Sequence, residues 1–149
     1  MRVNSGNVYL KNRNLTIRKA EFRDIPFCLE VEASHEDSTF SEHDFRNSIT
    51  DSNVIFLVAE QNQKVMGFIL GFIVPTRRRE ATIHSTMVHK QHCQKGIGSA
   101  LVRNFAKLAF EQGVELIFAE VEDGPDKFYE KCDFKKTMIW YSMILKKGI

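Results

Sequence analysis

Apolar and polar residues follow two spacings in this chain, one typical of strands and one typical of helices. Strict alternation over residues 15–18 predicts a first strand. Two longer runs, 53–60 and 64–74, predict a hairpin joined by residues 61–63. The second run is apolar on both of its faces, which is typical of a central strand covered by helices.

The first two helices are predicted from their N-terminal signals. Asp24 is expected to cap a helix that has Pro26 in its first turn and apolar residues along one side. Ser41 is followed three residues later by Asp44, an acidic relative of the capping box, which predicts a short second helix. A polar segment rich in acids, 34–39, connects the two.

A strand–helix–strand unit follows in the second half of the chain. Residues 81–88 predict a strand, and a helix is expected to begin near Ile97, after a loop that contains two glycines. Apolar residues recur at helical spacing until Gly113, which supplies the C-terminal stop. Residues 115–121 predict the next strand, and a helical crossover between two strands of one sheet predicts that they are parallel.

The remaining pattern predicts a short helix over 126–132 and one long or broken strand over 134–145. The expected order is therefore β-α-α-β-β-β-α-β-α-β. This order predicts an α/β (α+β) fold, a mixed, mostly antiparallel central sheet flanked by helices. We expect a single domain over residues 1–149, in which 1–13 form an N-terminal extension.

Composition narrows the class of protein. A chain of 149 residues that is 43% hydrophobic can bury one core, and a net charge of +2 does not favour nucleic acid or an anionic membrane as a partner. The start of the chain lacks the apolar stretch of a signal peptide, and the longest apolar run, 65–74, is too short to span a bilayer. The three cysteines have neither disulfide nor metal spacing, so we expect a reduced, cytoplasmic protein without a metal site.

The loop at residues 93–98 carries the strongest chemical signal. Gly96 and Gly98 allow a sharp turn and a close backbone approach to a ligand. The helix that follows has unpaired N-terminal amides and the positive end of its dipole, which together form a seat for a phosphate. An ordinary strand-to-helix turn remains the alternative for this pair of glycines. The spacing fits neither a P-loop nor a dinucleotide-binding fold.

Two motifs resemble those of the GCN5-related N-acetyltransferases, the GNAT family. Residues 93–98 match the pattern Gln/Arg-x-x-Gly-x-Gly/Ala except at Cys93, and residues 128–134 match Phe-Tyr-Glu-Lys-x-Gly-Phe except at Asp133. Glu122 and Pro125 replace an asparagine and an alanine that are usual in the family. Together with the element order over residues 15 to 145, the resemblance implies a GNAT-like sheet whose fourth and fifth strands are parallel and splayed.

The resemblance also implies acetyl-CoA (coenzyme A) as the cofactor. The main chain of Met87 and Val88 would pair with the pantetheine arm, in place of a missing strand partner. Backbone amides of the glycine loop would hold the pyrophosphate, and Lys95 would add positive charge. The residues expected to bind the cofactor are Met87, Val88, Cys93, Gln94, Lys95, Gly96, Ile97, Gly98, Ser99 and Phe128.

The implied reaction is direct transfer of an acetyl group to a primary amine. Tyr129 occupies the place of the acid that protonates the leaving thiolate, and the Val88 amide the place of the oxyanion donor. A phenol suits the acid role because it is protonated at neutral pH. The alternative for Tyr129 is an aromatic side chain that only packs on the last helix. An acyl-enzyme on Cys93 is not required by a family that works by direct transfer.

A base for the amine is expected on the strand over residues 81–88. Simple alternation places Thr82, His84 and Thr86 on one face and Ile83, Ser85 and Met87 on the other. His84 aligns with a histidine of arylalkylamine-type family members, and an imidazole titrates near working pH. A half-buried structural histidine is the alternative, and Glu80 or a chain of waters could then serve as base.

The acceptor would enter near the connection between the first two helices, where acidic residues would attract a cationic amine. Glu32, His35, Glu36 and Asp37 lie there, and three of them carry carboxylates. Both a small-molecule amine and a peptide amine fit, and a homodimer is compatible with the fold. The competing functions are an acetyl-CoA-binding regulatory module with weak or no catalysis, and a phosphate-sensing domain unrelated to acyl transfer.

Overall fold

The computed structural model describes residues 2–3, 14–77, 79–93, 95–119 and 127–134. Within them, six strands form one sheet in the order β1-β2-β3-β4-β5-β6, and only β5 and β6 pair in parallel. The strands are β1 (Arg2–Val3), β2 (Leu15–Lys19), β3 (Val54–Gln61), β4 (Lys64–Ile73), β5 (Glu80–Val88) and β6 (Leu116–Ala119). The predicted mixed, mostly antiparallel sheet is confirmed.

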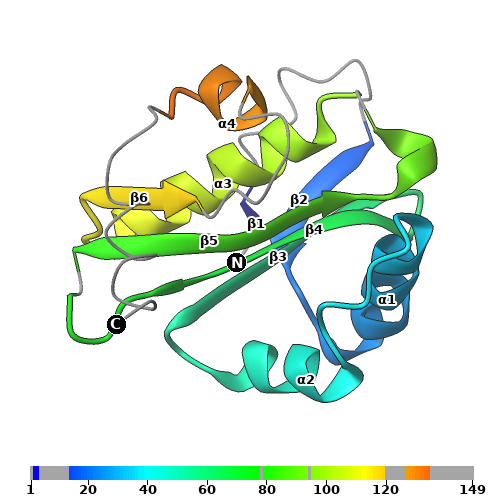
Figure 1. Cartoon of the computed structure of the whole chain (residues 1–149), viewed down its shortest axis with the longest axis horizontal. Coiled ribbons are helices and arrows are strands. Elements are labelled where there is room, and N and C mark those ends of the chain that lie inside the picture. Colours follow the sequence, from blue (N-terminus) through cyan, green and yellow to red (C-terminus); the bar gives the residue numbers. More distant parts are fainter. Residues whose placement is uncertain (1, 4–13, 78, 94, 120–126, 135–149) are drawn as a thin grey trace, which may run out of the picture.

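Helices cover both faces of this sheet (Figure 1). Helices α1 (Ile25–Ser34) and α2 (Glu42–Thr50) lie on one face, and α3 (Ile97–Glu111) and α4 (Lys127–Lys131) lie on the other. Two short 3-10 turns, η2 (Phe22–Asp24) and η3 (Lys90–His92), precede α1 and α3. From β2 onward the predicted order of elements holds over the described residues, but β1 was not predicted, because it lies in the segment expected to be an N-terminal extension. The last predicted strand, 134–145, lies almost entirely outside the described residues.

Local signals in the sequence explain the start of α2 and the turn between β3 and β4. At the start of α2, the Ser41 hydroxyl accepts from the Asp44 amide at 3.1 Å, and the Asp44 carboxylate accepts from the Ser41 amide at 2.9 Å. This is the reciprocal capping box that the sequence predicts. Between β3 and β4 the turn residues are Asn62 and Gln63, with φ of 51° and 64°. Two consecutive positive φ angles are typical of the I′ hairpin turn, whose twist matches that of the strands.

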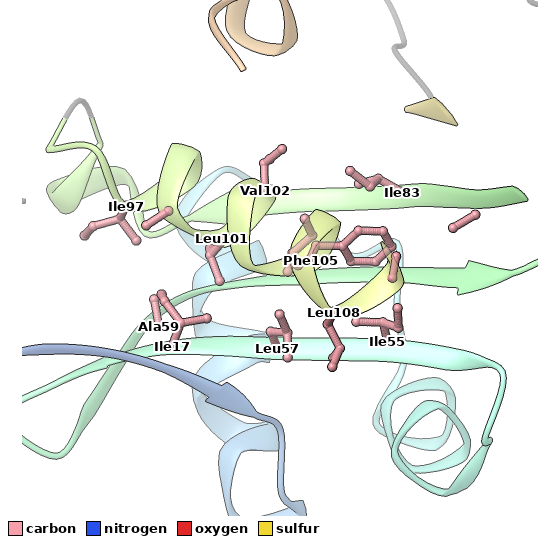
Figure 2. Packing of buried hydrophobic residues seen from close by; sticks show 14 of the residues in the cluster. Ile17, Ile55, Leu57, Ala59, Ile83, Ile97, Leu101, Val102, Phe105 and Leu108 are labelled. Carbon is pink, nitrogen blue, oxygen red and sulfur yellow. The ribbon is translucent and has the colours of Figure 1, made fainter. Parts of the chain in front are cut away.

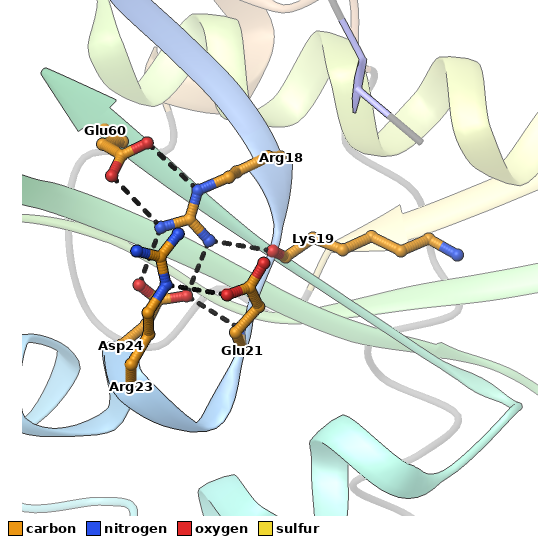
Figure 3. A network of polar contacts seen from close by, with 6 residues as sticks. All are labelled: Arg18, Lys19, Glu21, Arg23, Asp24 and Glu60. Carbon is orange, nitrogen blue, oxygen red and sulfur yellow. Dashed lines mark hydrogen bonds and ion pairs between the residues drawn. The ribbon is translucent and has the colours of Figure 1, made fainter. Parts of the chain in front are cut away.

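Asp24 is the N-cap residue of α1, as predicted, but its side chain does not cap the helix. Its side chain makes no cap hydrogen bond to α1 and is buried instead against the Arg18 guanidinium, at 2.7 and 2.8 Å (Figure 3). Asp24 also accepts from the Glu21 amide, and Arg18 donates to Glu60 on β3. The two carboxylates raise the pKa of Arg18, which therefore stays charged. This network joins β2, β3 and the turn before α1 into one rigid corner.

The core has two parts, one on each face of the sheet. Beneath α3, strand residues such as Ile17, Leu57 and Ile83 pack against Leu101 and Phe105 (Figure 2). Beneath α1 and α2 lies an aromatic cluster, in which the rings of Phe40, Phe45, Phe56 and Phe68 contact one another. Burial of these apolar side chains is the main source of stability for the packing of helices on both faces of the sheet.

A β-bulge interrupts β5 in its middle. Leu70 on β4 pairs with Ser85 and the next residue, Gly71, pairs with Ile83, so His84 is an extra residue on β5. An extra residue kinks the strand and ends strict alternation of its side chains. Even-numbered residues after His84 therefore point to the opposite face from even-numbered residues before it.

The bulge makes the predicted face assignment wrong. Ile83 packs beneath α3, but Met87, which alternation would place on the same face, packs with the α1–α2 cluster. Thr86 and Val88 instead face α4 and α3, where they contact Tyr129 and the core. Simple counting fails here because the register with β4 decides which way each side chain points.

Candidate active site

The start of α3 presents free main-chain donors. Gly96 is the N-cap residue with a φ of 82°, a left-handed conformation that favours glycine, and it has no side-chain cap bond. The first bond of the helix runs from the Ala100 amide to the Gly96 carbonyl at 3.1 Å. The amides of Ile97, Gly98 and Ser99 therefore lie in the first turn, where intrahelical acceptors are missing. Lys95 is exposed beside them, and Gln94 lies outside the described residues.

An aromatic residue from α4 lies directly on this helix start. A Cβ atom placed on Gly98 would approach the Phe128 ring to 3.0 Å and the Val88 side chain to 3.7 Å. The absence of a side chain at position 98 thus lets α4, α3 and the end of β5 meet. Phe128 belongs to this junction, and its role as a cofactor-binding residue stays a prediction. Its neighbour Tyr129 is held beside the junction by contact with the Phe128 ring.

Tyr129 contacts β5 through its hydroxyl group. Its oxygen lies 3.1 Å from the Thr86 hydroxyl oxygen, and its ring packs at the edges of Phe128 and Phe134. Burial is the main cause that raises the pKa of Tyr129 above that of a free phenol, and the hydrogen bond with Thr86 opposes this in part. The phenol therefore keeps its proton at neutral pH and can donate it.

The main chain of Val88 points to the open side of β5. The His89 amide donates to the Met66 carbonyl on β4 at 2.8 Å, so the preceding residue, Val88, directs its amide and carbonyl to the opposite edge. In the described part of the chain, the pairing of β6 with β5 extends only to Ile83 and Ala119. Among the described residues, Val88 therefore lies beyond the part of β5 that pairs with β6.

Two side chains approach the Val88 carbonyl oxygen. The His35 Nε2 atom lies 2.6 Å from it, and the Cys93 Sγ atom lies 3.6 Å from it and 3.6 Å from the His89 carbonyl. Cys93 stands where the family pattern has Gln or Arg, and its thiol reaches the strand rather than the helix start. The contact of His35 spans 53 residues of sequence and has no signal in the sequence.

His84 lies on the face of α1 and α2. Its ring is half-buried and meets the Phe40 ring edge-on, with 5.3 Å between the ring centroids. Tyr129, on the opposite face, contacts the strand two residues further along, at Thr86. The predicted base and the predicted acid thus face opposite sides of β5.

Glu80 lies far from Thr86 and Tyr129. It begins β5, pairs with Leu116, and lies 3.9 Å from Arg77 in the turn before the strand. Six residues separate it from Thr86, which is about 20 Å along an extended strand. The structure therefore separates this candidate base from Tyr129 by most of the length of the sheet.

The acids predicted to attract a cation are mostly engaged in the fold. Glu32 lies within α1, is buried, and accepts from the Phe40 amide at 3.2 Å, and burial raises its pKa. Asp37 accepts from the amide and the hydroxyl of Thr39, which lower its pKa. Glu36 is exposed. The expectation that these residues line a polar loop is wrong for Glu32.

The position of Asp133 has a structural cause. It has a φ of 69°, its amide donates to the Glu130 carbonyl, and the Phe134 amide donates to the Tyr129 carbonyl. These two bonds form a Schellman motif at the end of α4, in which glycine is the usual residue at the left-handed position. Asp133 therefore replaces a glycine at a helix terminus rather than a cofactor contact. Glu122 and Pro125 lie outside the described residues.

Two general features of the described residues bear on function. Of the helices within the described ranges, none has the length and apolar character needed to cross a bilayer. In the same part of the chain, His, Cys, Asp and Glu side chains do not gather in groups of three or more that could hold a metal ion.

Comparisons with known proteins agree with this geometry. The uncharacterized N-acetyltransferase CgeE of Bacillus subtilis (strain 168) is 32% identical over 91 residues, 58% of this chain but only 35% of that protein. A crystal structure of a transcriptional regulator from Bacillus halodurans C-125 has a TM-score of 0.73 at 26% identity, and covers 83% of this chain and 94% of its own.

PaiA N-acetyltransferase from Thermoplasma acidophilum, solved with coenzyme A, shares the fold with a TM-score of 0.70 at 21% identity. That likeness covers 83% of this chain and 91% of the archaeal chain. The sequence pattern of the acetyltransferase (GNAT) family matches residues 16–134, which include every described element except β1 and the first residue of β2. Since this match spans most of the chain, the protein belongs to the GNAT family of acetyltransferases.

Proposed function

We propose that this protein transfers the acetyl group of acetyl-CoA directly to a primary amine. The observation that carries the proposal is the meeting of three features at the end of β5. These are the uncapped start of α3, the outward-facing main chain of Val88, and the buried hydroxyl of Tyr129. Membership of the GNAT family supplies the reaction class.

The residues present fit the cofactor. The first-turn amides of α3, from Ile97 to Ser99, and the exposed ammonium of Lys95 would hold the pyrophosphate, since unpaired amides and a helix dipole favour an anion. The Val88 carbonyl, which has a second lone pair beside its contact with His35, would accept from an amide of the pantetheine arm. PaiA from Thermoplasma acidophilum, which shares this fold, was solved with coenzyme A. Acetyl-CoA supplies an activated thioester when bound.

The protein's own groups would act on the two sides of the reacting carbonyl. The Val88 amide donates a hydrogen bond where negative charge develops on the carbonyl oxygen, and Tyr129 donates its proton to the departing sulfur. The amine approaches from the face of α1 and α2, where both His84 and His35 lie. Acid and acceptor are thereby kept on opposite faces of β5.

A second candidate is a regulatory module that binds acetyl-CoA with weak or no catalysis. Cys93 favours it, because the side chain that replaces the family's Gln or Arg contacts the Val88 carbonyl instead of the helix start. The two candidates share the cofactor site and differ in turnover.

Release of coenzyme A thiol from acetyl-CoA, measured with a panel of small amines and short peptides, tests the proposal. We expect amine-dependent release, together with acetylated product of the expected mass. Thermal stabilisation by coenzyme A but not by ATP, with no release for any amine, would support the regulatory module. Absence of both stabilisation and release would overturn cofactor binding itself.

A further inference from the structure

His35 is held in place by the C-terminus of α1. It is the C-cap residue of this helix, and the Glu36 amide donates to the Ala33 carbonyl while the Asp37 amide donates to the Glu32 carbonyl, both at 3.0 Å. This is a Schellman motif, with Glu36 in the left-handed conformation at a φ of 57°. The backbone of His35 is therefore fixed although its side chain is exposed.

The connection after α1 is also tied to the end of β5. The His35 ring contacts the Val88 carbonyl at 2.6 Å, and the Ser34 hydroxyl accepts from the Lys90 amide at 3.1 Å. These contacts join segments more than 50 residues apart in the chain. Together with the helix cap, they hold the imidazole at the open edge of the strand.

The contact with Val88 determines the tautomer of the ring. A carbonyl oxygen can only accept, so the Nε2 atom of His35 must carry the hydrogen. In the neutral ring the lone pair is then on Nδ1, and this atom can accept a proton. When it does so, the Val88 carbonyl stabilises the resulting imidazolium, because a hydrogen bond from a charged donor is stronger than one from a neutral donor.

His35 is closer to the reacting end of β5 than His84. It contacts the carbonyl of the same residue whose amide we assign to the developing oxyanion. It is the C-cap residue of α1, and α1 lies on the face from which the amine would approach (Figure 1). His84 precedes Val88 by four residues, roughly 12 Å along the strand. Its ring is also engaged with Phe40. A proton acceptor must reach the attacking nitrogen directly or through one water.

From this geometry we propose that His35 is the general base for the acceptor amine, an assignment that rests on the proposed acetyl transfer. As the nitrogen–carbon bond forms, the proton on nitrogen passes to Nδ1 of His35. As the carbon–sulfur bond breaks, Tyr129 would donate its proton to the departing sulfur. The imidazolium releases its proton to solvent and the phenolate is reprotonated, so the protein returns to its starting state. The products are the acetylated amine and coenzyme A.

Other titratable groups lie near the His35 ring. On the same connection these are Glu36 and Asp37, of which Asp37 interacts electrostatically with His35. From the segment after β5, Cys93 shares the Val88 carbonyl, and Lys90 is bonded through its amide to the neighbouring Ser34. Variants that leave these groups unchanged therefore isolate the imidazole.

The decisive variant is His35→Gln, because a glutamine amide can still donate to the Val88 carbonyl but cannot act as a base. We expect kcat to fall about 100-fold or more, in the range of a lost general base, and the acidic limb of the kcat profile to disappear. The KM for acetyl-CoA should stay within about twofold. His43→Gln, which alters an exposed histidine on α2, is the matched control and should leave both unchanged.

The outcomes separate this inference from the proposed function. Equal kcat and an unchanged acidic limb in His35→Gln, with an active wild type, would overturn the role of His35 alone. A lower kcat with the acidic limb kept at the same pH would show a positioning role and would also overturn it. A wild type inactive with every amine would overturn the acetyl transfer itself, and the base assignment with it.

A measurement on the ligand-free protein tests the tautomer independently of activity. Nitrogen NMR of the histidine side chains should show neutral His35 as the Nε2–H form, bonded to a carbonyl. His35→Gln identifies the signal by its loss. A neutral ring protonated on Nδ1, or a mixture of both forms, would contradict the contact with Val88 and overturn the proposal.

Discussion

The two faces of β5 differ in what the helices bring to them. On the face of α3 and α4, a glycine turn, an aromatic ring on Gly98 and the Thr86–Tyr129 hydrogen bond form a dense junction. On the face of α1 and α2, His84 extends from β5 toward the ring of Phe40, and His35 reaches the strand from the C-terminus of α1. On the first face the Tyr129 hydroxyl is fixed by close packing, whereas on the second face the His35 side chain is exposed.

The bulge at His84 produces this difference. Without the extra residue, alternation would place Thr86 and His84 on one face, and the phenol and the imidazole would compete for the same side of the strand. With it, Thr86 turns to Tyr129 while His84 stays with Phe40. A single added residue thus places the proposed proton donor and the proposed proton acceptors on opposite faces of one strand, and bulges are common next to active sites.

The largest expected effect concerns the face of α3 and α4. Gly96→Val places a β-branched side chain at a φ of 82°, which is strained and fills the approach to the first-turn amides. We expect the affinity for coenzyme A, measured by calorimetry, to fall at least about 100-fold, a loss of roughly 2.7 kcal/mol.

Gly113→Val is the matched control for Gly96→Val. Gly113 has a similar φ of 91°, lies beyond the other end of α3, and has no atom within 4 Å of an added Cβ. It should cost stability by about 1–2 kcal/mol through the same backbone strain without changing affinity for coenzyme A. Equal losses of affinity in both variants would contradict the assignment of the loop.

Tyr129→Phe should give a smaller, catalytic effect. The variant keeps the ring and its packing but removes the proton donor, so kcat should fall by about 10²-fold while affinity for coenzyme A stays within about twofold. Because burial raises the pKa of Tyr129, ionisation of this acid should not reduce wild-type activity until the pH exceeds about 10. Full activity in the variant, or a Tyr129-dependent loss of rate near pH 8, would exclude the acid role.

The smallest effect compares helix ends on the two faces. Glu36 at the end of α1 and Asp133 at the end of α4 occupy the left-handed position of a Schellman motif, where Gly113 serves α3. Glu36→Gly should raise the free energy of unfolding by about 0.5–1 kcal/mol, because relief of strain exceeds the added chain entropy of glycine. Asp133→Gly should gain less, since aspartate tolerates this conformation better. Denaturant unfolding that shows a loss for both would contradict the strain.

Much of the architecture follows from the sequence because its signals are local. Apolar spacing over a few residues specifies each strand and helix, the Ser41–Asp44 box specifies the start of α2, and Gly113 specifies the end of α3. The glycine loop likewise predicts where α3 begins, and it is the basis for the proposed anion site there. Asp24 shows the limit of such signals. Its side chain forms an ion pair with Arg18 on β2 and therefore does not cap the helix that it precedes.

Only the tertiary structure decided how the site is divided between two faces. The register of β4 against β5 placed the bulge at His84, so no count along β5 alone could assign Thr86 and His84 to their sides. The contact of His35 with Val88 joins residues far apart in the chain, and Glu32 is buried by the packing of α1. Sequence determined which chemical groups the protein has near the end of β5. Their directions depend on pairing and packing between distant segments, which local patterns do not encode.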